Sequence, residues 1–204
     1  MSLSQAARTN TSQITDALLS KKQMQKYVVV PKIAAIIASE TNQADSTLAN
    51  LTTELGDIGY NIAGVLQSPS PQATNRCNAE LFCIGTGEKY TISQDLGSCS
   101  ISCSLDVEAL ENIALKLRDS ISDDTDLVII NRFGKRECSD GGFCCVIERA
   151  VELGIPVLTV VNTHFIEAWL DYGGQQVTII ENDQQQLSHW AHAVLPSIRL
   201  IAAP

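Results

Sequence analysis

The chain has 204 residues, of which 45% are hydrophobic, and its 23 acidic and 14 basic residues give a net charge of -9. That length fits one domain with a short extension, and the acidic balance excludes broad nucleic-acid binding, which needs a basic face. No apolar run approaches the roughly 18 residues of a membrane span, and the start of the chain lacks the apolar core of a secretory signal. We therefore expect a soluble cytoplasmic protein, with no nucleic acid and no membrane among its partners.

Residues 1–31 predict a partly disordered N-terminal extension, with a polar and basic stretch at 21–26. A single domain is expected over residues 32–204. Its first apolar run, 33–38, predicts a strand covered on both faces, followed by a polar loop at 39–43. A helix is expected from about Asp45 to Leu55, because three leucines recur there at helical spacing: Leu48, Leu51 and Leu55.

The next apolar run, 60–67, predicts a second strand. Residues 79–84 and 89–94 flank a glycine-rich turn, which predicts an antiparallel hairpin. Asp106 is a suitable N-cap for a helix, and five residues at helical spacing predict its buried face: Val107, Leu110, Ile113, Ala114 and Leu117. A buried central strand at 127–130 then runs into a dense polar turn at 131–137.

The remaining elements continue the alternation of helix and strand. The expected elements are helices at 143–153, 163–172 and 183–194 and strands at 156–161 and 177–181. Such alternation predicts a three-layer α/β/α domain with a mostly parallel sheet and an inserted antiparallel hairpin.

The loop after the first strand has the position of a phosphate-binding loop but not its residues. In G-x-x-x-x-G-K-[ST], glycines let backbone N–H groups approach phosphate, the lysine reaches the outer phosphates and the hydroxyl holds magnesium. Here Ser39 and Ala44 occupy the glycine positions, Asp45 the lysine position and Ser46 the hydroxyl position. An aspartate would repel a triphosphate; the alternative is that Asp45 only caps its helix.

The end of the central strand departs from hydrolase chemistry in the same way. Phosphate-loop hydrolases place a magnesium-supporting aspartate there, often followed by a glutamate that orients water. This chain has Asn131 and Arg132, and neither side chain can act as a carboxylate base. Compared with these hydrolases, the charges at all three positions, Asp45, Asn131 and Arg132, are therefore altered together.

Two family resemblances follow from these motifs. From Ile33 to about Val194 the chain resembles the small nucleoside-triphosphatases of thermophiles, with N-R-F-G-K-R-E on their D-E-I-G-P-M-E segment and G-I-P-V-L on the following strand motif. It is more similar to the domain of unknown function 2478 family, through I-S-Q-D-L-G, C-S-L-D, N-R-F-G-K-R-E and the Trp169…Gly173-Gly174 ending. These resemblances imply a degenerate phosphate-loop NTPase fold, with a weak association to bacterial molybdenum metabolism.

We therefore expect a ligand site between the loop after the first strand and the turn after the central strand, roofed by residues 94–103. In one arrangement, Asp45 pairs internally with Arg132 or Lys135. In the other, the basic cluster of Arg132, Lys135 and Arg136 binds a small anion. The expected ligand-binding residues are Ser39, Asp45, Ser46, Gln94, Asp95, Asn131, Arg132, Lys135, Arg136 and Glu137.

The seven cysteines offer a weaker alternative site. Their spacings match no standard zinc motif, but three of them fall in predicted loops near strand ends: Cys77, Cys103 and Cys138. We treat these three as weak candidates for a metal or molybdenum site and assign no other metal ligand.

The leading functional hypothesis is a nucleotide- or oxyanion-binding regulatory domain without normal NTP hydrolysis. The alternatives are an enzyme with reshaped chemistry, using Lys135, Glu137 or Asp95 as acid or base, and a metal-related accessory protein. No cofactor is identified, a small anion or nucleotide is the expected partner, and homodimer formation stays open.

Overall fold

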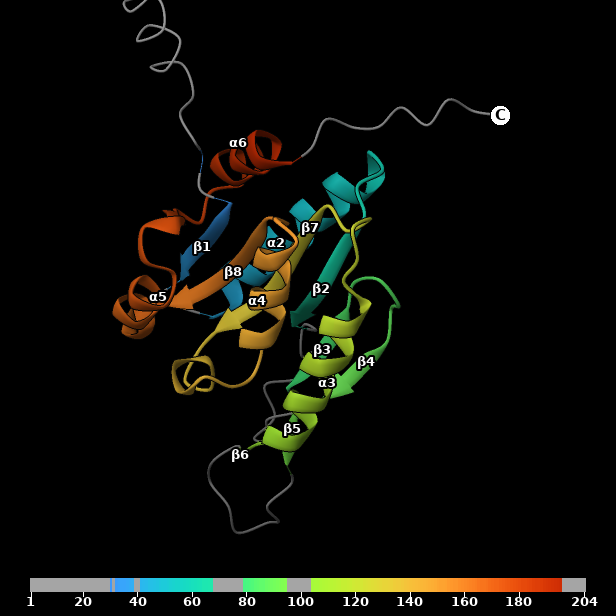
Figure 1. Ribbon diagram of the computed structural model, residues 1–204, viewed down its shortest axis with the longest axis vertical. Helices are drawn as coiled ribbons and strands as arrows, with labels where there is room; N and C mark the ends of the chain where they lie inside the picture. Colours follow the sequence, from blue (N-terminus) through green and yellow to red (C-terminus); the bar gives the residue numbers. More distant parts are fainter. Residues whose placement is uncertain (1–29, 31, 39–40, 68–78, 95–103, 196–204) are drawn as a thin grey trace, which may run out of the picture. The chain divides into compact units, whose positions relative to one another are not determined.

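The computed structural model describes residues 30, 32–38, 41–67, 79–94 and 104–195. Its main sheet has seven strands in the order β4-β3-β2-β7-β8-β1-β9 (Figure 1). The strands are β1 (Ile33–Ala38), β2 (Ile62–Gln67), β3 (Glu80–Cys83), β4 (Lys89–Thr91), β7 (Leu127–Phe133), β8 (Val157–Asn162) and β9 (Val177–Ile180). The two-residue strands β5 (Ser93–Gln94) and β6 (Ser104–Leu105) pair separately.

Five strands of the main sheet run parallel, from β2 through β7, β8 and β1 to β9. The other two form the predicted hairpin, because β3 and β4 pair antiparallel and β3 joins the sheet at β2. Central strands of a parallel sheet are covered on both faces, which accounts for the unbroken apolar run of β1 and the mostly apolar, buried sequences of β7 and β8. The predicted strand at 33–38 is confirmed residue for residue.

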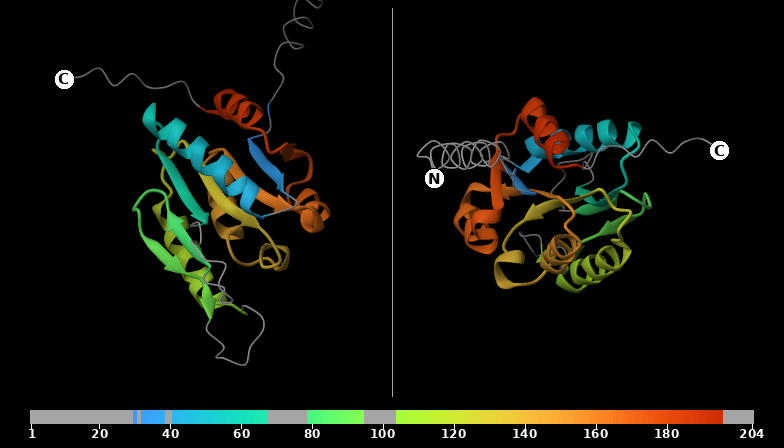
Figure 2. Two further views of the ribbon diagram at one scale, coloured as in Figure 1. Left: turned by 180° about the vertical axis from the view of Figure 1, so that it is seen from behind. Right: turned by 45° about the horizontal axis from the view of Figure 1, so that its top comes forward.

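Helices cover both faces of this sheet. α2 (Thr41–Asp57) and α6 (Gln184–Val194) pack together on one face, and α3 (Val107–Ser120) and α4 (Cys144–Glu152) pack together on the other (Figure 2). α5 (Ile166–Gly173) packs beside β8. Three short 3-10 helices are described: η1 (Glu137–Ser139), η2 (Thr163–Phe165) and η3 (Gly174–Gln176). The predicted three-layer α/β/α class is correct.

The buried faces of α2 and α3 follow the predicted spacing with one exception. The leucines at 48, 51 and 55 are fully buried in α2, and Asp106 caps α3 by accepting a hydrogen bond from Ala109 N at 2.9 Å. Val107 was expected in the core, but its side chain is 42% exposed. It is the first residue of α3, and the buried face begins one turn later, at Leu110.

The end of the central strand differs from prediction at the carboxyl edge of the sheet. The central strand continues to Phe133 instead of ending at Ile130, so three residues of the expected turn belong to β7. Phe133 is 2% exposed and packs against Trp169 and Tyr172, with ring centroids 5.1 and 5.4 Å away. This aromatic contact extends the buried part of the strand beyond its aliphatic run.

The predicted N-terminal extension lies outside the described residues apart from Val30. None of the described helices is long and apolar enough to cross a membrane.

Candidate functional site

Polar side chains collect where the parallel strands end. Gln67 is the last residue of β2, Asn131 and Arg132 lie near the end of β7, and Asn162 is the last residue of β8. Asp45 lies on α2, the helix that follows β1. In open α/β sheets this edge is where ligands bind. The structure therefore places three of the predicted site residues, Asp45, Asn131 and Arg132, in one cluster.

An irregularity in β7 lets two consecutive residues serve the same cluster. Successive side chains of a regular strand point to opposite faces, so Asn131 and Arg132 would normally diverge. The register between β7 and β8 shifts between Ile130 and Phe133. Such bulges redirect side chains at sheet edges. Both residues consequently reach Asp45.

Asn131 is 3% exposed, and its amide lies against Gln67 and Asp45. In the amide orientation that satisfies these neighbours, its nitrogen donates to Asp45 Oδ1 at 3.1 Å and its oxygen accepts from Gln67 N at 3.1 Å. Buried amides need partners because an unmet hydrogen bond costs about 1–3 kcal/mol. Asn131 is thus a fixed part of the protein interior, held between β2 and α2.

Arg132 forms an ion pair with Asp45, with Nη2 and Oδ2 3.6 Å apart and side-chain exposures of 31% and 21%. Burial raises the pKa of Asp45, and the nearby Arg132 charge only partly offsets this. Burial likewise lowers the pKa of Arg132 against the opposing effect of Asp45. Desolvation therefore outweighs attraction for both partners, which is common for partly buried pairs. The internal pair between Asp45 and Arg132 is the first of the two predicted alternatives.

The loop preceding Asp45 is much shorter than a phosphate-binding loop. α2 begins at Thr41, four residues before the predicted start, so only two residues separate it from the end of β1 at Ala38. With Ser39 and Ala44 at the glycine positions, no residue favours the turn that a phosphate loop requires, and residues 41–44 continue the helix. Ser46 is exposed on α2.

The rest of the predicted basic turn forms a second cluster. Glu137 is 5% exposed, and its carboxylate accepts hydrogen bonds from Gly134 N at 2.9 Å and Phe143 N at 3.1 Å. Glu111 on α3 accepts from Arg136 Nε at 2.6 Å and Gly142 N at 2.8 Å. Arg136 and Glu137 therefore hold the segment between β7 and α4 together.

Gly142 makes room for this second cluster. Its φ is +58°, and an added Cβ would lie 2.2 Å from Glu137 Oε1. For Glu111, burial tends to raise the pKa, but the Gly142 amide and the Arg136 guanidinium together lower it. These contacts link α3 to the turn after the central strand.

Two carboxylates in the two clusters should give stability profiles of opposite pH dependence. The pKa of Asp45 is raised in the folded state, so wild type should gain stability relative to Asp45→Asn as pH falls through that pKa. The pKa of Glu111 is lowered, so its stabilisation is present above the unfolded-state pKa and is lost as pH falls through the folded-state pKa. Denaturant titrations of wild type, Asp45→Asn and Glu111→Gln across the acid range measure both differences. Slopes of the same sign would contradict this assignment.

Several predicted residues cannot be placed. Ser39, Asp95, Cys77 and Cys103 lie outside the described residues, and Gln94 is the last residue of β5. Cys138 is exposed in η1, and within the described residues no group of three or more metal-ligating side chains occurs. Burial raises the pKa of Cys144 to about 12, which disfavours a thiolate at the start of α4.

Sequence reasoning missed Gln67 and Glu111. Gln67 is the polar last residue of a strand, a signal like the one that identified Asn131. Glu111 resembles an ordinary surface charge of an amphipathic helix, and no local pattern distinguishes it.

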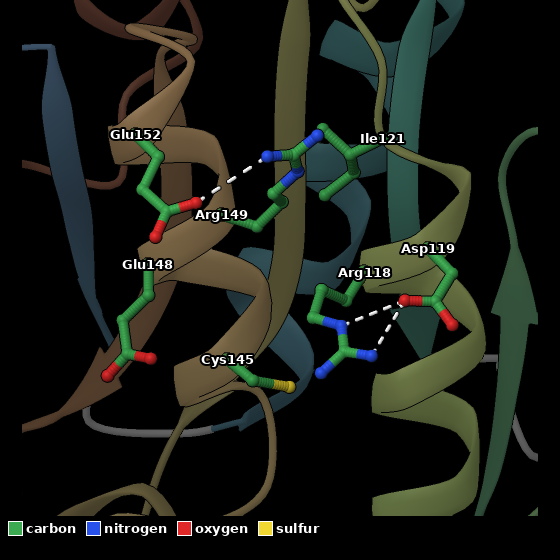
Figure 3. A pocket seen from close by; sticks show the side chains of 7 residues that line it. All are labelled: Arg118, Asp119, Ile121, Cys145, Glu148, Arg149 and Glu152. Atoms are coloured by element: carbon green, nitrogen blue, oxygen red, sulfur yellow. Dashed lines mark hydrogen bonds and ion pairs between the residues drawn. The ribbon is translucent and has the colours of Figure 1, made fainter.

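A groove of about 620 Å³ lies between α3 and α4, away from the Asp45 cluster (Figure 3). Arg118 and Arg149 line it, and each pairs with a carboxylate of its own helix, Asp119 at 2.7 Å and Glu152 at 3.5 Å. These pairs are at least 40% exposed, so solvent screens the attraction between their charges. The groove is a charged surface feature, and none of its lining residues belongs to the Asp45 cluster.

Comparison with known proteins places the chain in a family and agrees with its fold. The chain belongs to the family described as protein of unknown function (DUF2478), which matches residues 33–190. It is 30% identical over 161 residues to the molybdenum import ATP-binding protein ModC 2 of Bradyrhizobium diazoefficiens, covering 78% of this chain but only 18% of that much longer protein. It is 21% identical over 158 residues to the nucleoside-triphosphatase THEP1 of Methanocaldococcus jannaschii, covering 76% of this chain and 92% of that protein.

Among solved structures, the chain is similar to that of a human cancer-related nucleoside triphosphatase, with a TM-score of 0.54, 12% sequence identity, and coverage of 79% of this chain and 93% of that one. The domain therefore has the fold of the phosphate-loop NTPases.

Proposed function

We propose that this protein is a regulatory or binding domain that holds a small oxyanion or nucleotide on a phosphate-loop NTPase scaffold without normal NTP hydrolysis. The observation that carries the proposal is the engagement of Asp45 by Arg132 and Asn131. In the hydrolases, the corresponding positions hold a lysine, an aspartate and often a glutamate. Here these groups satisfy one another inside the protein.

The electrostatics of the cluster support the loss of hydrolysis. A carboxylate at position 45 repels the outer phosphates that a lysine would attract, and Asn131 cannot supply the anionic support that magnesium needs. Arg132 stays protonated at any physiological pH and cannot act as the base that orients water. Each of the three substitutions removes a different part of the reaction.

The short connection before α2 favours a small ligand over a triphosphate. A phosphate loop uses several consecutive backbone N–H groups to surround the phosphates. Only two residues connect β1 to α2, and residues 41–44 are helical. The first N–H groups of a helix can still approach a single anionic group. We therefore favour an oxyanion such as phosphate, sulfate or molybdate.

We expect purified protein to show no ATP or GTP hydrolysis above background. Its melting temperature should not rise when magnesium is added with either nucleotide, because Asp45 and Asn131 replace the groups that would bind the complex. A phosphate-release assay and thermal melts measure the two quantities, with an active phosphate-loop NTPase as positive control. Turnover that disappears in Asn131→Ala or Ser46→Ala would overturn the proposal.

A second candidate is an accessory domain of molybdenum import, and the relationship to ModC 2 supports it. The matched segment is 18% of that relative's length, so a domain of this kind occurs within a larger import ATP-binding protein. Under this proposal the chain is a bacterial cytoplasmic domain, spanning residues 32–204 after an extension at 1–31, and molybdate is its preferred oxyanion. The exposed Cys138 is its one described thiol among the three weak metal candidates. A comparison of molybdate with phosphate and sulfate distinguishes it from a general oxyanion site.

The reshaped enzyme is less well supported. Glu137 would have to serve as acid or base, but its two carboxylate oxygens already accept backbone hydrogen bonds. The exposed Lys135 side chain makes no hydrogen bond or ion pair within the described residues.

A further inference from the structure

The turn after β7 is fixed from both sides by two carboxylates. Glu137 binds the backbone N–H groups of Gly134 and Phe143, so it joins the beginning of the turn to the start of α4. Glu111 binds the N–H of Gly142 and the guanidinium of Arg136, so it joins the same segment to α3. Four hydrogen bonds of 2.6–3.1 Å therefore set the path of residues 134–143.

Further backbone contacts close the turn. Cys138 N donates to Gly134 O at 3.1 Å, and Ser139 Oγ donates to Lys135 O at 3.4 Å. Asp140 has a left-handed φ of 54°, a conformation that aspartate tolerates better than most residues. The backbone of Lys135 is thus held in place.

The three cations of this segment have different roles. Arg132 is paired with Asp45, and Arg136 is paired with Glu111. The Lys135 side chain is exposed and makes no hydrogen bond or ion pair with the part of the chain that the structure describes. The arginines before and after it, Arg132 and Arg136, are both paired within the protein.

We propose that Lys135 is the side chain that contacts the bound oxyanion, and that Glu111 and Glu137 are positioning residues that hold its turn. This inference rests on the proposed oxyanion-binding function and assigns the predicted residues to separate roles. Lys135 supplies a compact ammonium with three donors at the carboxyl edge of the sheet. Arg136, which the sequence places in the same basic cluster, acts through the turn and does not contact the anion.

The chemistry fits a small, doubly charged oxyanion. Charge-assisted hydrogen bonds to oxyanions are stronger than hydrogen bonds between neutral groups. A lysine also does not impose the planar, bidentate geometry of arginine. A turn that is ordered before binding also loses less conformational freedom when the ligand arrives. Without the two carboxylates, only the backbone contacts within residues 134–143 would order the turn before the ligand arrives.

The test is a calorimetric titration at constant ionic strength with phosphate, sulfate and molybdate as separate probes. Lys135→Gln should weaken binding of the preferred probe by about tenfold, the effect of losing one charge-assisted contact. Lys89→Gln, which removes an equally exposed lysine from β4, is the matched control and should leave the affinity unchanged.

Positioning residues should behave differently from the contact residue. Glu111→Gln should weaken binding several-fold and also speed hydrogen exchange at the Gly142 amide, whereas Lys135→Gln should weaken binding and leave that exchange unchanged. Wild-type binding that Lys135→Gln retains, or that Lys89→Gln loses equally, overturns this inference alone. Absence of binding by wild type to all three probes overturns the proposed function and this inference with it.

Discussion

Replacing Gly64 by alanine is expected to lower the free energy of unfolding by about 3–5 kcal/mol, combining backbone strain with overpacking. Gly64 lies in the middle of β2 opposite Ile129 of the central strand, and its φ is +148°. A Cβ added there would lie 2.0 Å from the Ile129 carbonyl oxygen and 2.8 Å from its carbonyl carbon. Because the obstacle is backbone, no change of rotamer can relieve it, and the β2–β7 pairing must open.

The matched control is Gly56→Ala in α2. Gly56 has no atom within 4 Å of an added Cβ and lies in the last turn of a helix, where alanine is favoured over glycine by roughly 0.5–1 kcal/mol. Urea denaturation followed by circular dichroism compares the two variants. An unchanged midpoint for Gly64→Ala would mean that β2 and β7 do not approach as closely as the structure shows.

The fold was predictable because the strands carry their own signals. The apolar run at 33–38 is typical of a strand that is buried on both faces. Glycine and proline mark where such elements end. The glycine inside the second predicted strand also has a recognised meaning, because glycine in a strand interior often marks a close backbone approach. Local sequence was therefore sufficient for the α/β class and the inserted hairpin, whereas the strand order depends on pairing between distant segments.

The arrangement of the site was predictable only in part. The three altered positions, Asp45, Asn131 and Arg132, meet as expected because parallel strands bring their carboxyl ends to one edge. The β-bulge that turns Asn131 and Arg132 to the same partner depends on the pairing of β7 with β8, which no local pattern encodes. Glu111 is 25 residues from its partner Arg136, so their pairing depends on how α3 packs against α4.

The start of α2 was predicted wrongly for a different reason. The polar residues at 39–43, between an apolar run and the leucines of the helix, predict a loop. The missing glycines at Ser39 and Ala44 were noted as a loss of phosphate contacts, but they also remove the reason for a loop. The helix accordingly extends back to Thr41. The same substitutions that remove the chemistry also change the backbone.

Replacing Glu137 by alanine should lower the free energy of unfolding by about 2–5 kcal/mol, since each charge-assisted hydrogen bond contributes about 1.5–3 kcal/mol and the freed N–H groups regain water only in part. Glu137 is 5% exposed, and its carboxylate is the acceptor for both Gly134 N and Phe143 N. Faster hydrogen exchange at the Phe143 amide should accompany the loss of stability, because that donor belongs to the buried end of the turn.

Glu152→Ala is the control that separates this effect from loss of a carboxylate as such. Glu152 is on α4, its side chain is 69% exposed, and its contact with Arg149 is 3.5 Å long, so its replacement should change stability by no more than about 0.5 kcal/mol. If Glu137→Ala were instead as stable as wild type or more stable, the carboxylate would not be holding the turn. Functional groups are often kept at a cost to stability, so that result would favour a role for Glu137 as acid or base and with it the reshaped enzyme. A large loss of stability with unchanged Glu152→Ala would show that the Glu137 carboxylate holds the turn.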